Sequence, residues 1–494
     1  MTNTISTTAA AATAPALTLD ALANETRMIA TPWSRMVRGI GLGQYPVSFD
    51  HEAAARIRHT FGLLEKKGVT EASPYTRFSQ LLADLVLTAE EPGQPHRRST
   101  VENALGPILH AIRAEKNPYF RLMATTILVD TVAKLGLDSG LLVNDDIDIV
   151  AELLQVADAI EPDQIKDENA GRHGHYERLS AYSAAFLAIG QLGLKHRLVA
   201  DGRDYVTEAL HLLEKIPAPF YRGRGGSMLL SVITLLGYGD HIHARGRDYI
   251  KETLDYLDRA DEIAKPPAFP QPMSDAFVKI YPLLTLLNAI AMTGRSQTYL
   301  TYGKDRLAEA GKLLEEITPV ERTHMGLYYL VALNNLGVLE QEVPDQDAFV
   351  KDIVGQWEHT DPGLNYFLNG IAYAYIIQTA MLTGSMDQIG DGLLDRYVAG
   401  FPDLDRTDDD RVNRPYPFAY ALNVLGEIGE AGRLFTPHPA YGDRTPTEWV
   451  IDSLSEGGKE EGRLYMLNHA LVSYALRLRG SEGGETPLFA DFRS

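Results

Sequence analysis

The sequence predicts an all-α fold of helical-hairpin repeats that close into an (α/α) toroid of about six to eight hairpins. Three observations predict this fold. One amphipathic phrase occurs three times, as "GRDYVTEALHLLEKI" from Gly202, "GRDYIKETLDYLDRA" from Gly246 and "GKDRLAEAGKLLEEI" from Gly303. The helices that follow these copies are apolar nearly all round, and strand patterns are nearly absent. Self-similarity at such a period indicates stacked helical hairpins.

The chain divides into three predicted parts. Residues 1–17, "MTNTISTTAAAATAPAL", are predicted to be a disordered tail, and they lack the basic and apolar segments of a secretory signal. Residues 18–100 show a less regular pattern and are predicted to be an N-terminal helical cap. Residues 101–494 carry the repeats and are predicted to be the toroid domain.

The repeated phrase is predicted to form outer helices. In the copy from Gly202, apolar residues recur at the spacing of one helix face and charged residues cover the other face. Asp204, Asp248 and Asp305 fall in the first turn of the three copies, where a carboxylate favours the helix dipole. The glycine before each copy allows the chain to reverse.

The helices between these copies are predicted to be buried on most sides, because they are apolar nearly all round. They begin near residues 119, 176, 221, 276, 323, 364, 416 and 463. Each ends in glycine, the residue preferred just beyond a helix C-terminus. These glycines are residues 136, 193, 237, 294, 337, 384, 426 and 480.

A closed toroid is favoured over an open αα-solenoid, which is the alternative layout. The terminal glycines lie 42 to 57 residues apart, whereas solenoid families keep strict repeat lengths. Tyrosine, asparagine and histidine concentrate on the inner helices, where a plain scaffold would carry aliphatic residues. The long connections "KPPAFPQPMSD" and "FPDLDRTDDDRVNRPYPF" are predicted to be loops on the rim of the toroid.

The polar residues of the inner helices form the candidate site. A toroid directs such groups toward one cavity, where a histidine or tyrosine can transfer a proton and asparagine can orient a substrate. The candidate catalytic residues are His324, Tyr328, Tyr373 and His469. The candidate substrate-binding residues are Asn334, Asn365, Asn369, Tyr375 and Asn468. The structural alternative is that these side chains only hydrogen-bond neighbouring helices.

A glycine-rich segment, "YRGRGGS" from Tyr221, adds two candidate substrate-binding residues. Arg222 and Arg224 can bind an anion or a carboxylate through their guanidinium groups, and the glycines allow backbone N–H groups to approach it. The segment lacks the G-x-x-x-x-G-K-[ST] spacing of a P-loop and follows no strand, which excludes a nucleotide site of that kind.

Clusters of acidic and histidine residues are weaker candidates. Asp145, Asp146 and Asp148 can hold Mg²⁺, but their position before an apolar helical run favours helix capping. Two H-x-H pairs lack a third spaced metal ligand; they are His173 with His175 and His241 with His243. We therefore predict no cofactor and no metal site, with Mg²⁺ at the aspartates as the alternative.

The composition excludes several classes of function. A net charge of −20 disfavours binding to nucleic acid and to an anionic membrane surface. The absence of cysteine excludes disulfides, thiolate nucleophiles, iron–sulfur clusters and cysteine zinc sites. The longest apolar runs are shorter than the about 20 residues that a membrane span needs. We therefore predict a cytoplasmic protein without a membrane span.

These features predict an enzyme that acts by acid–base chemistry on a largely apolar small molecule, as a cyclase, isomerase or lyase without a redox cofactor. The expected layout is analogous to that of class II terpene cyclases, in which aromatic rings stabilise carbocations. The D-x-D-D and D-D-x-x-D motifs of terpene cyclases are absent. The alternative function is a helical-repeat protein that holds a peptide or protein partner on its concave face. A sugar-chain enzyme is the third option, disfavoured because only three tryptophans are present to stack on sugar rings.

Overall fold

The computed structural model of the 494-residue chain describes residues 51–88, 98–135, 137–160, 166–167, 172–200, 202–260, 273–358, 366–404, 414–454 and 461–480. This part of the chain is mostly helical, which confirms the predicted all-α class. Its strands form two short antiparallel ladders, β1 (Lys166–Asp167) with β2 (Arg172–His173) and β3 (Val199–Ala200) with β4 (Arg203–Asp204). The predicted tail and the first part of the predicted cap lie outside the described residues, as do most residues of the two predicted rim loops.

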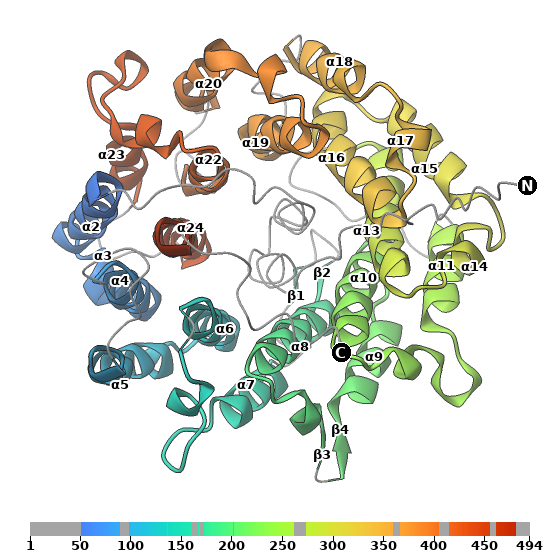
Figure 1. Cartoon of the computed structure of the whole chain (residues 1–494), viewed down its shortest axis with the longest axis horizontal. Helices are drawn as coiled ribbons and strands as arrows, with labels where there is room; N and C mark the ends of the chain where they lie inside the picture. The colour runs from blue at the N-terminus through green and yellow to red at the C-terminus, as the bar shows by residue number, and fades with distance from the viewer. Residues whose placement is uncertain are drawn as a thin grey trace, which may run out of the picture.

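The helices alternate along the chain between an inner layer and an outer layer (Figure 1). The inner layer consists of α6 (Pro118–Lys134), α8 (Gly174–Gln191), α10 (Pro219–Leu235), α13 (Asp275–Met292), α16 (Pro319–Leu336), α19 (Tyr366–Thr383), α22 (Pro415–Glu427) and α24 (Glu461–Gly480). The outer layer contains α5 (Arg98–Ala114), α7 (Ile149–Asp158), α9 (Tyr205–Glu214), α11 (Tyr249–Asp258), α15 (Arg306–Glu316), α18 (Gln346–Glu358), α20 (Gly390–Ala399) and α23 (Pro446–Asp452). The connections between layers include α14 (Ser296–Leu300), α17 (Leu339–Glu342) and the 3₁₀ turns η3 (Ser139–Leu141), η5 (Lys195–Leu198), η6 (Gly239–Gly246), η7 (Met386–Gln388), η8 (Phe401–Leu404), η9 (Ala431–Phe435) and η10 (Pro439–Tyr441).

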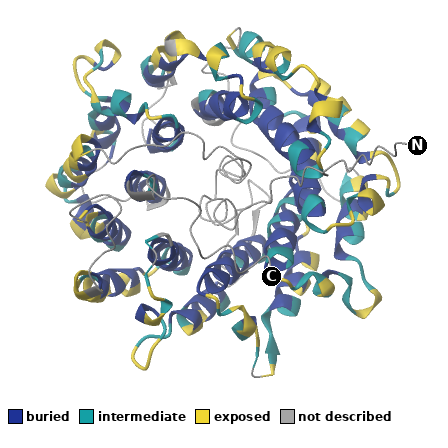
Figure 2. Cartoon of the chain, in the orientation of Figure 1, coloured by how far each residue is buried: buried dark blue, intermediate teal, exposed yellow. Residues whose placement is uncertain are grey.

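Burial distinguishes the two layers (Figure 2). The inner helices are buried along most of their length, whereas exposed residues gather on the outer helices and the turns. This difference follows from the sequence, because a helix that is apolar all round is stable only when other elements cover it on most sides.

The first described helices lie beside the last one. These first helices are α2 (His51–Lys66), α3 (Val69–Ala72) and α4 (Pro74–Leu87). The C-terminal helix α24 packs mainly against α22 on one side and against α4 on the other (Figure 1). Between α24 and α4, Asn468 Nδ2 donates a 2.8 Å hydrogen bond to Thr76 Oγ1. The two ends of the described chain are therefore in direct contact.

The neighbouring inner helices α13 and α16 run in the same direction at a fixed register. Side-chain hydrogen bonds between the α13 and α16 segments join residues that are 47 positions apart in sequence. The pairs are Ser274 with Glu321, Tyr281 with Tyr328, and Asn288 with Asn335. A constant offset along both helices means that they are parallel, so equivalent residues of these two hairpins lie at the same level.

Glycines end most of the inner helices as the sequence predicts. Left-handed backbone, with φ of 66° to 82°, follows five of these helices at Gly193, Gly237, Gly294, Gly337 and Gly384. Gly136 lies outside the described residues, and Gly480 is the last residue of α24. The prediction for Gly426 is wrong, because α22 continues to Glu427 and the left-handed residue is Gly429. A Cβ atom at Gly426 would lie 3.0 Å from Tyr474 Cδ2, so this glycine allows α24 to approach α22.

The repeated sequence forms salt bridges between consecutive helices of the outer layer, and we call each set of these salt bridges a joint. Asp204, Asp248 and Asp305 are the N-cap residues of α9, α11 and α15, one position before the predicted first turn. The basic residue before the first cap, Arg203, contacts Asp158 Oδ2 at 2.7 Å. Asp158 is the last residue of the preceding outer helix, α7. Arg203 also contacts Glu208 of the following helix, α9, at 2.7 Å, so one guanidinium group joins two outer helices.

The same joint recurs in the two later copies. Arg247 joins Glu214, the last residue of α9, to Glu252 in the first turn of α11. In the third copy, Lys304 and Arg306 both contact Asp258, the last residue of α11, at 2.8 Å and 2.6 Å. Each copy of the repeated sequence therefore forms salt bridges that join its outer helix to the preceding outer helix.

The glycine-rich segment is part of a helix, and the prediction that its backbone approaches an anion is wrong. The segment lies in α10, where backbone N–H groups beyond the first turn are bonded within the helix. A Cβ atom at Gly223 would lie 2.5 Å from Pro282 Cβ, and one at Gly225 would lie 2.7 Å from Leu179 Cδ2. These glycines therefore allow α10 to pack closely against its inner-layer neighbours α8 and α13.

We expect Gly223→Ala to destabilise the protein by about 1–3 kcal/mol, because the new methyl group would overlap the rigid ring of Pro282. The matched control is Gly62→Ala in α2, where no atom lies within 4 Å of the added Cβ. That control is expected to be neutral or to stabilise by about 0.5–1 kcal/mol, since alanine favours a helix over glycine. Urea denaturation of both variants measures the difference, and equal effects would contradict the close-packing role of Gly223.

One helix of the described chain, α13, is long and apolar enough to cross a membrane by length and composition. It packs between α10 and α16 in the inner layer, and 67% of it is buried there. A buried core helix meets the same criteria, so α13 is weak evidence for a membrane span.

Candidate functional site

Aromatic side chains of four consecutive inner helices meet at one level. Tyr281, Tyr328 and Tyr375 are spaced 47 residues apart on α13, α16 and α19, and Tyr420 follows on α22. Successive ring centroids lie 5.0, 6.2 and 6.1 Å apart. We define the tyrosine–histidine cluster as these four tyrosines together with Arg224, His324 and Tyr416.

His324 lies at the middle of this cluster and is 6% exposed. Its ring stacks on Tyr375, with centroids 4.1 Å apart and an interplanar angle of 26°. Its Nε2 atom lies 3.3 Å from the Tyr328 hydroxyl, which donates a 3.1 Å hydrogen bond to the Tyr281 hydroxyl. The other ring nitrogen, Nδ1, makes no hydrogen bond within the described residues. Burying such a nitrogen without a hydrogen-bond partner costs free energy.

Burial sets the protonation states of the cluster. Burial, together with the positive charge of Arg224, lowers the pKa of His324 to about 3, so its imidazole is neutral near neutral pH. Burial raises the pKa of Tyr416 to about 12 and holds the pKa of Tyr375 well above its ordinary value. The cluster therefore presents a neutral imidazole among protonated hydroxyl groups.

Arg224 supplies the positive charge of the cluster. Its guanidinium carbon lies 5.4 Å from the centroid of the Tyr281 ring, at the distance of a cation–π contact. The same charge lowers the pKa of His324 and partly offsets the rise that burial causes in the pKa of Tyr416. Arg224 is therefore close enough to stabilise negative charge that develops on a ligand beside these residues.

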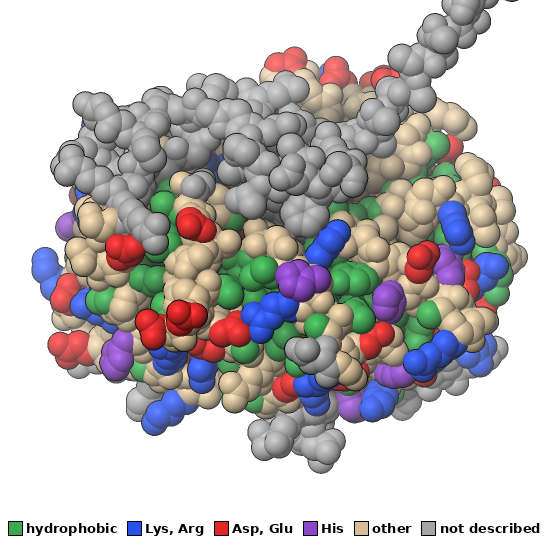
Figure 3. All heavy atoms as spheres, turned by 60° about the horizontal axis from the view of Figure 1, so that its bottom comes forward, with side chains coloured by type: hydrophobic (Ala, Val, Ile, Leu, Met, Phe, Trp, Pro, Cys, Tyr) green, Lys and Arg blue, Asp and Glu red, His purple; other side chains and the backbone are tan. Residues whose placement is uncertain are grey.

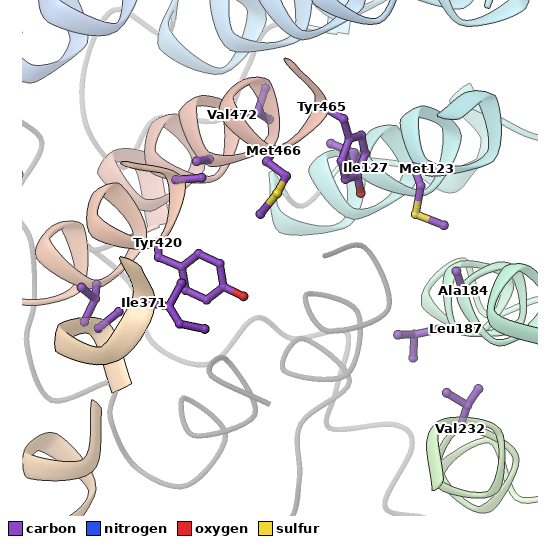
Figure 4. Packing of buried hydrophobic residues seen from close by; sticks show 14 of the residues in the cluster. Met123, Ile127, Ala184, Leu187, Val232, Ile371, Tyr420, Tyr465, Met466 and Val472 are labelled. Atoms are coloured by element: carbon purple, nitrogen blue, oxygen red, sulfur yellow. The ribbon is translucent and has the colours of Figure 1, made fainter. Parts of the chain in front are cut away.

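Figure 4 shows the packing of buried hydrophobic side chains from several inner helices. In this view, the labelled side chains belong to α6, α8, α10, α19, α22 and α24. They are Met123, Ile127, Ala184, Leu187, Val232, Ile371, Tyr420, Tyr465, Met466 and Val472, all of them buried.

Two predicted site residues point to the outer layer instead. Tyr373 stacks on Tyr397 of α20 with ring centroids 4.8 Å apart, and it contacts Trp357 of α18 edge-on. Arg222 lies over Tyr256 of α11, with its guanidinium carbon 4.0 Å from the ring centroid. These positions separate Tyr373 from Tyr375 and Arg222 from Arg224.

The predicted residues of α24 form a second group. His469 stacks on Tyr465, and its Nε2 atom lies 3.5 Å from Ser473 Oγ. The Tyr465 ring in turn stacks on Phe120 of α6. Asn468, which hydrogen-bonds α4, is fully buried. The described contacts of this group join α24 to α4 and α6.

Of the remaining predicted asparagines, the structure describes the side chain of Asn334 alone. Asn334 is half-buried in the last turn of α16, and its Nδ2 atom makes no hydrogen bond within the described residues. Asn365 lies outside the described residues, and the side chain of Asn369 in α19 is also outside them.

The acidic and histidine clusters of the sequence have structural contacts. Asp148 caps α7 and forms a paired salt bridge with Arg197, which holds the pKa of its carboxyl below the ordinary value. His241 lies 3.4 Å from the cap residue Asp204, and His243 lies 3.7 Å from the cap residue Asp248. Within the described residues, no three histidine, aspartate or glutamate side chains gather as metal ligands.

Sequence reasoning found four members of the cluster and missed three. Arg224, His324, Tyr328 and Tyr375 were predicted; Tyr281, Tyr416 and Tyr420 were not. The signal for Tyr281 is the 47-residue spacing from Tyr281 to Tyr328 and from Tyr328 to Tyr375, which places these three tyrosines at one level of parallel helices. Tyr420, which follows Tyr375 after 45 residues, departs slightly from this spacing.

Comparison with known proteins yields no matching family model, no matching curated protein and no matching solved structure. A buried imidazole with a hydrogen-bonded tyrosine pair, a nearby guanidinium and an apolar inner face is the most distinctive chemical feature of the described chain. We therefore infer function from this geometry alone.

Proposed function

We propose that the chain closes into an (α/α) toroid and that the tyrosine–histidine cluster on its inner helices is an active site. Closure is supported by the packing of α24 between α22 and α4 and by the alternation of inner and outer helices. An open solenoid would leave its first and last repeats apart, with polar outer faces.

The proposed activity is acid–base chemistry on a largely apolar small molecule, as a cyclase, isomerase or lyase that needs no redox cofactor. The single observation that carries this proposal is the Nδ1 atom of the buried, neutral His324, which makes no hydrogen bond within the part of the chain that the structure describes. His324 would accept a proton from one atom of the substrate and return it to another, so that no further reactant is needed. Tyr328 and Tyr281 would hold the imidazole in place.

Arg224 gives this proposal an electrostatic basis. A base with a pKa of about 3 is weak near neutral pH. Because the charge of Arg224 is one cause of the low pKa, negative charge that develops on the substrate beside Arg224 would raise the basicity of His324 during the reaction. The same guanidinium group would stabilise that negative charge.

The surface of the described residues supports an interior ligand over a docked protein. Basic, acidic and histidine side chains are interspersed on the face in Figure 3. Among the described residues, Val199 is the one large hydrophobic side chain counted as exposed, at 41%. A protein-docking surface is expected to expose a contiguous apolar patch. This observation favours the enzyme over the repeat-scaffold alternative.

The first test of this proposal is thermal unfolding with prenyl diphosphates with and without Mg²⁺, apolar polyenes, uronate oligosaccharides and a mixed peptide pool. A ligand of the native state at about 100 times its dissociation constant adds about 2.7 kcal/mol to stability and raises the melting temperature. A shift with an isoprenoid or polyene supports the enzyme. A shift with peptides alone contradicts it and favours the scaffold.

The second test is turnover of the stabilising compound in D₂O, with deuterium incorporation measured by mass spectrometry. We expect His324→Gln to lower turnover at least about 100-fold, as the loss of a general base does. The control is His196→Gln, which changes an exposed histidine in the η5 turn and is expected to leave turnover unchanged. Equal turnover in the two variants would contradict the role of His324.

A further inference from the structure

One buried carboxylate joins the N-termini of two neighbouring inner helices. Glu321, in the first turn of α16, is 1% exposed. Its Oε2 atom accepts a 2.9 Å hydrogen bond from the Thr318 backbone N–H, which belongs to the capping box of α16. Ser274, the N-cap residue of α13, donates its backbone N–H to Oε1 and its hydroxyl to Oε2, both over 2.7 Å. The same carboxylate therefore caps α16 and binds the start of α13.

The bonds to Glu321 share their register with the hydrogen bond between Tyr281 and Tyr328. Tyr281 follows Ser274 by seven residues, and Tyr328 follows Glu321 by seven residues. Seven residues make about two turns of a helix, so both contacts lie on the same side of each helix. Both hydrogen-bonded pairs span 47 positions of the sequence. A slide of α13 along α16 would therefore break the bonds to Glu321 and separate the two tyrosine hydroxyls at once.

His324 lies between these two contacts along α16. Its Nε2 atom lies 3.3 Å from the Tyr328 hydroxyl in the following turn. Two rings of α13, those of Phe277 and Tyr281, meet the imidazole in T-shaped contacts, with centroids 6.1 and 5.9 Å away. The contacts between the imidazole and α13 therefore depend on the register of the two helices.

We infer that Glu321 is a positioning residue of the proposed active site, because its carboxylate fixes the register of α13 on α16 and thereby holds the imidazole of His324 and the Tyr281–Tyr328 pair in place. A carboxylate suits this task, since its two oxygens can accept from all three donors. Glu321 acts through these residues and not on the substrate. The inference rests on the proposed function, because it adds a residue to the same site.

The test is Glu321→Ala, observed through the ring C–H signals of His324 in a ¹H–¹³C spectrum of the full chain. These signals are identified by their loss in His324→Gln. Aromatic rings shift the signals of protons beside them, so the signals report where the α13 rings lie relative to the imidazole. We expect Glu321→Ala to shift them. Glu321→Gln is expected to shift them less, since glutamine also serves at this position of a capping box.

Ser274→Ala is a milder variant that separates register from capping of α16. It removes the hydroxyl bond to Glu321 and leaves the capping box between Glu321 and Thr318 in place. We expect a shift of the His324 signals in the same direction as in Glu321→Ala, but smaller, because the Ser274 backbone N–H still donates to Glu321.

The matched control is Glu448→Ala. Glu448 belongs to a capping box in the outer helix α23, where its Oε2 atom accepts from the Thr445 backbone N–H at 2.9 Å and from the Thr445 hydroxyl at 3.1 Å. This variant removes a capping box and leaves the contact between α13 and α16 intact. It is expected to lower stability without shifting the His324 signals.

Turnover of the compound found by the unfolding screen gives a second readout. We expect Glu321→Ala to lower kcat about 10- to 100-fold with little change in KM, because a misplacement of about 1 Å costs up to about 100-fold in rate. Glu448→Ala is expected to leave both constants unchanged.

Unshifted His324 signals in Glu321→Ala and Ser274→Ala, or equal shifts in Glu448→Ala, would overturn the inference. If His324→Gln abolishes turnover while these signals stay in place, the proposed function stands and the role of Glu321 is wrong. If the signals shift but His324→Gln leaves turnover unaffected, Glu321 fixes the helix register and the proposed function fails.

Discussion

When the pH falls from about 8 to about 4, the free energy of unfolding is expected to decrease more in the wild-type protein than in the His324→Gln variant. The expected difference between the two decreases is about 3 kcal/mol. His324 has a pKa of about 3 in the folded protein, against 6.5 for an ordinary histidine. The folded state therefore keeps the imidazole neutral where the unfolded chain binds a proton. Stability from this residue is full above about pH 6.5 and is lost as the pH falls toward 3.

The slope of this loss is about 1.4 kcal/mol per pH unit, the value for one proton taken up on unfolding. Urea denaturation at a series of pH values measures it for the wild type and the variant. His196→Gln, at an exposed site, serves as the control and is expected to follow the wild-type curve. Parallel curves for wild type and His324→Gln would mean that His324 is not held neutral by burial.

The layered arrangement was predictable from periodicity, and the direction of individual side chains was not. A helix that is apolar all round, such as α19, gives no signal for which face is directed inward. Tyr373 and Tyr375 were therefore both assigned to the site. Residues two apart on a helix point to opposite sides, since each residue turns the helix by about 100°. The structure places Tyr375 in the cluster and Tyr373 against the outer layer.

The arginines of the glycine-rich segment illustrate the same limit. Arg222 and Arg224 are also two residues apart, and one lies over Tyr256 of the outer layer while the other lies over Tyr281 of the inner layer. The glycines between and after them resemble those of a loop, because glycine disfavours an isolated helix. Tertiary packing overrides this preference here, since a side chain at Gly223 would overlap Pro282.

Asp258→Asn is expected to cost about 3 kcal/mol of unfolding free energy, more than the replacement of its partner in Arg306→Met. The side chain of Arg306 is 1% exposed, and its two terminal nitrogens donate to the two Asp258 oxygens at 2.6 and 2.8 Å. Without this carboxylate, the buried guanidinium keeps one carboxylate contact, with Glu309 at 3.3 Å. An under-compensated buried charge of this kind costs about 3–5 kcal/mol when its partner is removed.

Arg306→Met is expected to cost only about 1–2 kcal/mol, because it removes the buried charge and leaves a methionine side chain to fill the space. Asp258 is 30% exposed and would keep its 2.8 Å contact with Lys304. The equivalent joint at Glu214 provides the control, since the side chains of Arg247 and Glu214 are 33% and 34% exposed. Glu214→Gln is therefore expected to cost less than about 1 kcal/mol. Urea denaturation measures the loss of unfolding free energy in each of the three variants. Equal losses in Asp258→Asn and Glu214→Gln would show that the burial of Arg306 does not determine how strongly the salt bridges join the helices.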